Sequence, residues 1–406
     1  MAQDLPLSGV RVVELATVVA APTVGRMMAT YGAEVIKVET PSGDGLRPFG
    51  KGHCLPTEDG NSPLFDLYNS GKKFASLNLK TEQGKEAFHR LLSTADVFIT
   101  NVRYKGLERM ELDYDSIKEK YPRLVYAHFS GFGLKGADAD RPGYDMTAFW
   151  MRSGALLDWL LPNSFPMRPT FGFGDVATAS AFLSGIMMAL YSRNNTGKGT
   201  LVSTSLLSSG IWCNSAYVLN AQAPYNRQYP MERYDPWNPF AEWYECSDGK
   251  WIAVFEKRYA TDRFIFAEIF DFPDLAEDPD LEDLTRMRRS GKLPMVTKRV
   301  SEAILKKPSQ EWLQILAEKD IPSELLVNLK DVCEDKQAWV NGSFDEVEYP
   351  DGAKVAMPAP PIVFPEFERK AFSINQSIGE DTDEILKNVG YSEEEIANMR
   401  ANKAVR

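Results

Sequence analysis

The chain has 406 residues, of which 44% are hydrophobic and 25% charged, and its net charge is −11. These values predict a globular protein of two or three domains, and the acidic balance argues against nucleic acid and acidic membranes as partners. No apolar run reaches the ~18 residues of a membrane span. The N-terminus lacks the pattern of a signal peptide, and we therefore expect a cytoplasmic protein.

The first 130 residues alternate between short apolar strands and helices. Strands are expected at 10–15, 34–39, 74–79, 96–100 and 124–130, with helices at 24–30, from Thr81, and up to about Lys120. Such alternation is typical of a doubly wound α/β domain with a parallel sheet. Ligands of these sheets bind outside the carboxyl ends of the strands.

The middle of the chain is rich in aromatic residues. Residues 144–173 predict loops and short helices, an apolar helix follows to about residue 194, and a strand is expected at 200–206 before a second apolar helix that ends near 221. We therefore assign residues 1–221 to the N-terminal part of a large α/β domain.

A smaller α+β domain is expected in the second half of the chain. Residues 222–241 form the predicted linker, and residues 242–328 the small domain, with a hairpin at 242–255 and helices near 260–270, 297–307 and 309–318. Residues 329–406 then form a second linker and return to the large domain, with a hairpin at 350–352 and helices at 381–387 and 392–402.

Asp175 is the candidate for catalysis. It is the only carboxylate between Asp158 and Glu232, and it follows Gly172 and Gly174 at the start of an apolar helix. Glycines adopt positive φ and leave backbone N–H groups uncovered for a ligand carbonyl, and a helix N-terminus stabilises an ionised acid. The pattern predicts a carboxylate nucleophile beside oxyanion donors. A simple helix cap is the alternative.

Other cofactor and metal patterns are weak. Residues 172–177 mimic the dinucleotide pattern G-x-G-x-x-A, but the acid required about 20 residues later is missing, so we set aside nicotinamide and flavin sites. The four cysteines and three histidines are scattered, without the spacing of metal ligands. We expect free thiols, no metal and no tightly bound cofactor.

A series of short motifs points to one enzyme family. The motifs are 7–15, 20–22, 32–39, 43–47, Asn69 with 72–73, 77–80, 101–109, 130–133, 142–145, 174–175 and 196–199. On these motifs the chain resembles the family III CoA-transferases over essentially its whole length. Within that family it is most similar to the phenyllactate and 2-hydroxyisocaproate CoA-transferases, through 100–103, 142–145 and 238–240.

The resemblance implies that Asp175 attacks an acyl-CoA thioester and carries first an anhydride and then a CoA thioester. It implies that the substrate coenzyme A contacts Val18, Val19, Ala20, Lys80, Asn101, Val102, Arg109 and Met110, with Arg47 as a further phosphate ligand. Phe132, Tyr144 and Gly174 are expected beside the acyl group. The acceptor is expected to be a 2-hydroxy acid of amino-acid fermentation, either an aryl-lactate or a branched acid, and the assembly an interlocked homodimer.

The chain departs from the best-studied branch at Val19, Thr40, Ser130 and Phe132, where that branch has Gln, Arg, Lys and Tyr. A glycine-rich loop is missing near 234–241, and Val176 stands where the hydroxyacid branch has His. These differences concern recognition of the acceptor and shielding of the intermediate.

Two alternative functions remain open. A 2-methylacyl-CoA racemase of the same fold would use a His where this chain has Tyr144, and a phenol with a pKa near 10 is a poor base at neutral pH. A non-catalytic CoA-binding protein would not need Asp175. The aromatic side chains of 144–150 and 225–243 suit an apolar acyl group, or else a core or subunit interface.

Overall fold

The computed structural model describes residues 5–375 and 377–406, and the chain divides into two compact units. Unit 1 contains the described residues up to Leu156, Arg168–Gln222 and Lys336–Arg406; unit 2 contains Leu157–Met167 and Ala223–Asp335. These limits differ from the predicted domains at three places, one of which is the predicted linker, where residues 223–241 group with unit 2. Residues 157–167 group with unit 2, and the chain returns to unit 1 at 336 instead of 329.

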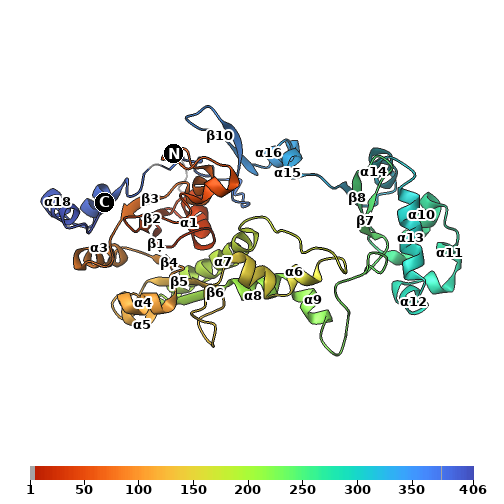
Figure 1. Cartoon of the computed structure of the whole chain (residues 1–406), viewed down its shortest axis with the longest axis horizontal. Helices are drawn as coiled ribbons and strands as arrows, with labels where there is room; N and C mark the ends of the chain where they lie inside the picture. The colour runs from red at the N-terminus through yellow and green to blue at the C-terminus, as the bar shows by residue number, and fades with distance from the viewer. Residues whose placement is uncertain (1–4, 376) are drawn as a thin grey trace. The chain divides into compact units, whose positions relative to one another are not determined.

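Unit 1 is built on a six-stranded parallel sheet in the order β3-β2-β1-β4-β5-β6 (Figure 1). Its strands are β1 (Arg11–Leu15), β2 (Glu34–Glu39), β3 (Lys73–Ser76), β4 (Val97–Thr100), β5 (Val125–Ser130) and β6 (Leu201–Ser205). The direction of winding reverses between β1 and β4, where Val13 of β1 pairs with Phe98 of β4. The prediction of a parallel α/β sheet is confirmed, and this reversal is where such folds bind ligands.

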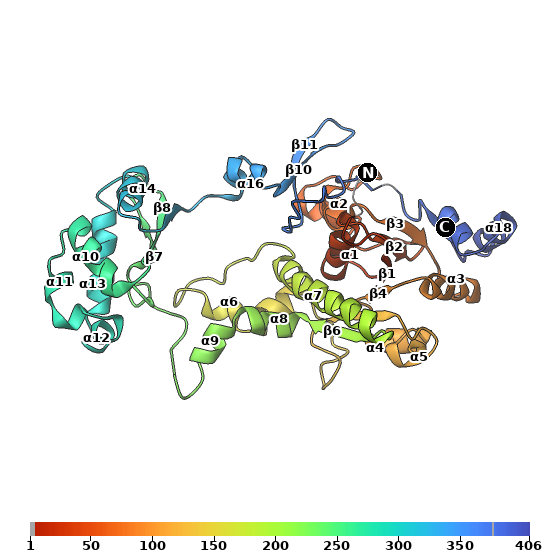
Figure 2. The same cartoon turned by 180° about the vertical axis from the view of Figure 1, so that it is seen from behind.

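Helices cover both faces of the sheet (Figure 2). Helices α1 (Ala20–Thr30) and α7 (Phe173–Thr196) share a core with Val12, while α3 (Glu82–Ser93), α17 (Thr382–Asn388) and α18 (Glu393–Ala401) share the opposite core with Val13. Neighbouring residues of a strand point to opposite faces, so a doubly covered strand is apolar throughout.

The remaining elements of unit 1 are short. They are η1 (Phe49–His53), α2 (Pro63–Asn69), α4 (Tyr104–Met110), α5 (Tyr114–Ile117), the π-helix η2 (Asp145–Met151), α8 (Leu206–Cys213), α9 (Ser215–Asn220), α16 (Lys336–Val340) and the hairpin β10 (Phe344–Glu348)–β11 (Lys354–Pro358). Helix α6 (Ala155–Asp158) spans the boundary between the residues of unit 1 and those of unit 2. The predicted helix at 24–30 starts at Ala20, because Pro22 fits the first turn of a helix.

Helix α7 is long and apolar enough to cross a membrane by length and composition. Of the most apolar 18-residue window of this helix, 44% is buried within the protein. Ala179, Phe182 and Ile186 lie in the core beside α1. A core helix has the same composition as a membrane span, and the packing of α7 identifies it as a core helix.

Unit 2 has a three-stranded antiparallel sheet of β7 (Ala241–Glu245), β8 (Trp251–Phe255) and β9 (Ser323–Leu325). Its helices are α10 (Tyr259–Phe270), α11 (Asp274–Glu277), η3 (Pro279–Leu281), α12 (Leu284–Arg289), α13 (Leu293–Ile304), α14 (Ser309–Glu318) and α15 (Leu329–Val332). The predicted hairpin is present. The helix predicted at 297–307 starts at Leu293, because Pro294 occupies its first turn.

Charged side chains lie in the core of unit 1. Lys37 Nζ lies 3.2 Å from Glu14 Oε1 and 2.9 Å from Asp44 Oδ2, and Lys72 Nζ lies 2.9 Å from Glu14 Oε2. The side chains of Glu14, Lys37, Lys72 and Asp44, here called the buried charge network, are completely buried. A buried charge is costly unless it is paired, so each member depends on the others.

The network leaves no room for a side chain at Gly25, where an added Cβ would overlap the Glu14 carboxylate and touch Lys72. We expect Gly25→Ala to destabilise the protein by roughly 1–3 kcal/mol, the usual cost of overpacking, measured as a lower urea midpoint. Gly52→Ala is the control, because a Cβ there meets no atom within 4 Å. Equal urea midpoints for Gly25→Ala and Gly52→Ala would contradict this prediction, because they would show that the buried charge network rearranges at little cost in stability.

Candidate active site

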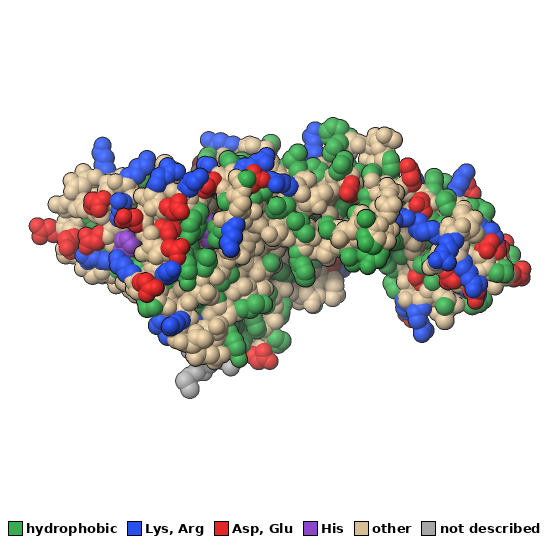
Figure 3. Space-filling model, turned by 90° about the horizontal axis from the view of Figure 1, so that it is seen from below, with side chains coloured by type: hydrophobic (Ala, Val, Ile, Leu, Met, Phe, Trp, Pro, Cys, Tyr) green, Lys and Arg blue, Asp and Glu red, His purple; other side chains and the backbone are tan. Residues whose placement is uncertain are grey.

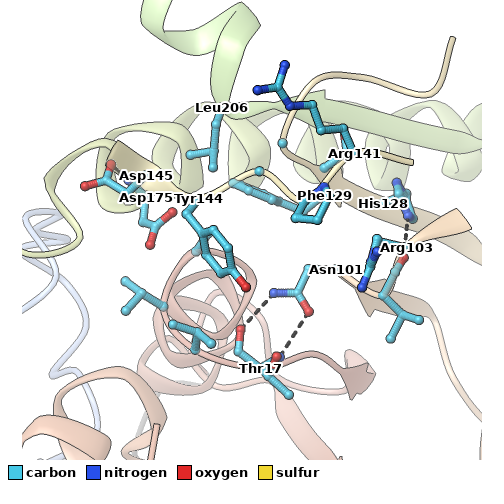
Figure 4. Close-up of a pocket in the computed structure, with 18 of the residues that line it drawn as sticks. Thr17, Asn101, Arg103, His128, Phe129, Arg141, Tyr144, Asp145, Asp175 and Leu206 are labelled. Carbon is cyan, nitrogen blue, oxygen red and sulfur yellow. Dashed lines mark hydrogen bonds between the residues drawn. The ribbon is translucent and has the colours of Figure 1, made fainter. Parts of the chain in front are cut away.

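A pocket of about 350 Å³ opens at the carboxyl ends of β1, β4 and β5 (Figure 4). This is the edge at which ligands are expected for a doubly wound sheet. The lining residues come from the segments that follow these strands and from the start of α7: 17–20, 101–104, 128–131, 139, 141–145, Asp175 and Leu206.

The structure brings together about half of the residues predicted from the sequence. Val18, Val19, Ala20, Asn101, Val102, Tyr144 and Asp175 all line the pocket. Lys80, Arg47, Arg109, Met110, Phe132 and Gly174 are outside the lining. Lys80 and Arg109 are exposed on the surface, and they remain predicted phosphate ligands.

Two of the predicted ligands have protein partners. Arg47 donates to both oxygens of Glu39, at 2.9 and 2.8 Å, and its guanidinium lies 4.1 Å from the centre of the Phe65 ring. Asn101 holds the backbone of Thr17, whose N–H donates to Oδ1 at 3.0 Å and whose carbonyl accepts from Nδ2 at 2.8 Å. Arg47 is therefore engaged away from the pocket, and Asn101 shapes the loop after β1.

Asp175 lies within the first turn of α7. The helix begins at Phe173, its N-cap is Gly172 with a φ of 73°, and no side chain caps it. The simple cap proposed as an alternative is therefore wrong. Asp175 is only 9% exposed, and its carboxylate points into the pocket (Figure 4).

A second carboxylate, Asp145 at the start of η2, lies beside Asp175 (Figure 4). The Asp175 N–H donates to Asp145 Oδ1 at 3.1 Å. Burial raises the pKa of Asp145, while hydrogen bonds from the backbone of Gly174, Asp175 and Gly172 and from the Trp150 side chain oppose the rise. The expectation of uncovered oxyanion donors at the two glycines is wrong, because Asp145 occupies them.

Gly174 is required for packing and not for a positive φ. It lies in the helix, and an added Cβ would overlap Asp145 Oδ1 and the Phe149 ring. Gly174 therefore lets the Asp145 carboxylate approach the start of α7 closely.

Burial, and secondly the charge of Asp145, raise the pKa of Asp175 to about 7. Burial also raises the pKa of Tyr68 to about 12, with the charges of Asp175 and Asp145 adding to the shift. The Tyr68 hydroxyl stands 3.5 Å from the position of a Cβ on Gly172. A carboxylate that titrates near neutral pH can serve as a nucleophile or a base.

Sequence reasoning assigned no role to several polar residues of the pocket. Asp145 stands in the motif 142–145, but its contact with Asp175, 30 residues away, is visible only in the fold. His128, within β5, lies 2.9 Å from the Val102 carbonyl through Nε2. Arg103 and Arg141 also line the pocket. The described residues contain no group of three or more metal-ligating side chains.

Comparisons with known proteins agree along the whole chain. The family model described as CoA-transferase family III matches residues 7–382. The chain is 36% identical to (R)-2-hydroxy-4-methylpentanoate CoA-transferase of Clostridioides difficile, over 98% of this chain and 99% of the relative. It is 35% identical to cinnamoyl-CoA:phenyllactate CoA-transferase of Clostridium sporogenes, over 98% and 97%.

Solved structures share the fold. A CaiB/BaiF family protein from Brucella suis superposes with a TM-score of 0.77 at 27% identity, covering 95% of this chain and 100% of that chain. A hypothetical protein from Mycobacterium tuberculosis gives a TM-score of 0.78 at 23% identity, covering 95% and 100%.

The closeness of Asp145 to Asp175 predicts that the pKa of Asp175 depends on the charge at position 145. In protein labelled with [4-¹³C]aspartate, the signal absent from Asp175→Asn should titrate at a pKa of about 7 in the wild type. Asp145→Asn removes a nearby negative charge, so the ionised form of Asp175 becomes more favourable and its pKa should fall. The exposed Asp115→Asn serves as the control. An unchanged titration in Asp145→Asn would contradict the coupling.

Proposed function

The chain belongs to CoA-transferase family III and is an enzyme of that class, and from this premise we propose that it transfers CoA from an acyl-CoA to a 2-hydroxy acid through covalent intermediates on Asp175. The observation that carries the proposal is the buried carboxylate of Asp175, which faces the pocket and has a pKa of about 7. A partly desolvated carboxylate near its pKa is available as a nucleophile at neutral pH.

The proposed reaction consists of acyl exchanges that consume no water. An Asp175 oxygen attacks the thioester carbon, the C–S bond breaks, and CoA leaves as a thiolate while an anhydride forms. The thiolate attacks the Asp175 carbonyl carbon, releasing the first acid as a carboxylate and leaving an aspartyl-CoA thioester. The carboxylate of the second acid attacks that carbonyl carbon, which forms a new anhydride and frees the thiolate. The thiolate takes the new acyl group and restores Asp175.

Geometry supports this sequence of exchanges. Asp175 stands at the pocket with Val19 and Ala20, so a thiol held against the start of α1 would stay within reach of the carboxylate. Burial of Asp175 limits hydrolysis of the anhydride by water. We place the pantetheine arm along 17–20 and Val102, and keep Lys80, Arg109, Met110 and Arg47 as predicted contacts of the nucleotide.

We propose a 2-hydroxy acid with an apolar side chain as the acceptor. Relatives with 36% and 35% identity are named for 2-hydroxy-4-methylpentanoate and phenyllactate. Phe129, Leu206 and Tyr144 line the pocket near Asp175, and apolar walls with a few polar groups are typical of small-molecule sites (Figure 4). Arg103 and Arg141 offer positive charge for a carboxylate or a phosphate.

One observation supports the racemase function: a carboxylate with a pKa of about 7 could also remove an α-proton. Tyr144, which stands in the position of the racemase His, is 66% exposed. The phenol of Tyr144 is not the imidazole that the racemase pattern requires at this position. Transfer therefore remains the better interpretation of the site.

Replacing the nucleophile tests the proposal. Asp175→Asn keeps the shape of the side chain but cannot form an anhydride, so we expect a loss of transfer of about 10³-fold or more, while calorimetry still detects CoA binding. Mass spectrometry of the wild type with acyl-CoA should find the added mass on the peptide that contains Asp175. Asp115→Asn is the control. Deuterium incorporation at the α-carbon without transfer would favour the racemase, and CoA binding without either reaction the binding protein.

We also propose that the enzyme is a cytoplasmic homodimer. Met188 and Tyr191 on the outer side of α7 are 71% and 72% exposed, and Trp212 of the neighbouring α8 is 77% exposed. Figure 3 shows a face of the molecule on which hydrophobic side chains are exposed in patches. Apolar surface of this kind is typical of an interface between copies of one chain. The free cysteines agree with a reducing compartment.

The oligomeric proposal is tested by light scattering. The wild type should have twice the mass of the chain, and Met188→Glu with Tyr191→Glu should shift the protein towards the monomer, because burying a charge in an apolar interface is costly. Phe264→Glu, at a 49% exposed position of α10 in unit 2, is the control. A monomeric wild type would contradict the proposal.

A further inference from the structure

The loop after β1, residues 16–19, contains an unusual backbone conformation. Val18 has a φ of 69°, in the left-handed region. A β-branched side chain crowds the backbone there, so a valine with positive φ is a genuine outlier. Such a conformation persists only where surrounding contacts hold it, and it is typical of functional sites. Thr17, Val18 and Val19 all line the pocket.

Each of the first three residues of this loop is held by a side chain from another element. The Val18 N–H donates to Asp44 Oδ1 at 3.1 Å. The Ala16 carbonyl accepts from Lys37 Nζ at 2.7 Å. Asn101 bonds both backbone groups of Thr17. The contact from Asp44 is the one made at the strained residue itself.

Asp44 has little freedom to move. It is 2% exposed, its Oδ1 also accepts the Leu46 N–H at 2.9 Å, and its own N–H donates to Glu39 Oε1 at 2.9 Å. Its Oδ2 pairs with Lys37, which is fixed in turn by Glu14 of the buried charge network. These contacts fix the orientation of the Asp44 carboxylate, so the lone pair of Oδ1 that Leu46 does not use points to the Val18 N–H.

Two members of the buried charge network lie in the central strands of the sheet, where charged side chains are unusual. Central strands of a parallel sheet are normally apolar on both faces, yet β1 and β2 carry Glu14 and Lys37 with fully buried side chains. Replacing paired buried charges by apolar groups is often neutral or stabilising. Local departures from the packing rules concentrate at functional sites. None of the four network residues lines the pocket.

We propose that Asp44 is a positioning residue, which holds Val18 in the left-handed conformation and so fixes the backbone on which the acyl-CoA rests. Released from Asp44, Val18 relaxes to negative φ, and the turn from β1 into α1 changes direction. The N–H groups of Ala20 and Ala21 in the first turn of α1, which have no preceding carbonyl within the helix, then no longer face the pocket in the same way. This inference rests on the proposed placement of CoA along residues 17–20.

The competing interpretation is that Asp44 only neutralises Lys37. In that case, removing the carboxylate lowers stability, and the effect on CoA binding does not depend on the residue at position 18. A positioning role makes a different prediction, because glycine adopts positive φ without strain. With glycine at position 18, the loop no longer needs the contact from Asp44.

A double-mutant cycle with the full chain separates the two interpretations. Calorimetry measures the Kd of CoA for the wild type, Asp44→Ala, Val18→Gly and the double variant. We expect Asp44→Ala to raise Kd about tenfold or more on the wild-type background and by less than about threefold on the Val18→Gly background, a clear non-additivity. Equal factors on both backgrounds would overturn the proposal.

Two further variants distinguish a loss of positioning from a general loss of stability. Asp113→Ala removes a 6% exposed carboxylate that caps α5 outside the pocket lining, and it should lower Tm without changing Kd. Asp44→Asn keeps an oxygen acceptor for the Val18 N–H, and its Kd should lie closer to the wild type than that of Asp44→Ala. A Kd for Asp44→Asn as high as that of Asp44→Ala would assign the effect to charge and overturn the proposal.

Hydrogen exchange gives a readout that needs no ligand. In the free protein, the amides of 16–20 should exchange faster in Asp44→Ala than in the wild type, and this increase should be smaller on the Val18→Gly background. Faster exchange with an unchanged Kd would overturn the positioning role in CoA binding. It would leave the proposed chemistry to be judged by the Asp175→Asn experiment, so the two proposals can fail separately.

Discussion

The proposed chemistry depends on one physical condition, the burial of the Asp175 carboxylate beside the pocket. Burial alone would favour the protonated acid, and the charge of Asp145 adds to that effect, so the Asp175 carboxyl titrates at a pKa of about 7. Asp145 is itself stabilised by the N–H groups at the start of α7. The N–H groups at the start of α7 thus oppose the rise that burial causes in the pKa of Asp145, while burial and the charge of Asp145 raise that of Asp175.

The fold supplies the rest of the site through the edge of one sheet. The loop after β1, the residues after β4 and the end of β5 meet where the winding of the sheet reverses. Their polar groups are committed to one another before any ligand arrives, as in the two hydrogen bonds between Asn101 and Thr17. Such preorganisation reduces the reorganisation needed during the reaction.

Much of the fold could be predicted from the sequence, because buried parallel strands and the turns between them leave a strong local pattern. Asp175, which lines the pocket, could be singled out from the sequence because it stands alone among apolar residues and beside two glycines. The role of Asp145, the bonds of Asn101 to a loop 84 residues away and the positive φ of Val18 could not be predicted. Each depends on side chains that only the folded chain brings together. Arg47 remains a predicted phosphate ligand, and its pairing with Glu39 could not be foreseen from the sequence.

The C-terminal segment completes the large unit from the far end of the chain. Ile385, Leu386 and Met399 pack into the same core as α3, and the Asn78 N–H donates to the Ala404 carbonyl at 2.8 Å. During synthesis, therefore, the part of this sheet face that α17 and α18 cover stays open until both helices have been made, after all of unit 2. A nascent chain with a partly open apolar face is prone to aggregation, and a chain that stops before α17 would leave α3 without the two helices that share its core.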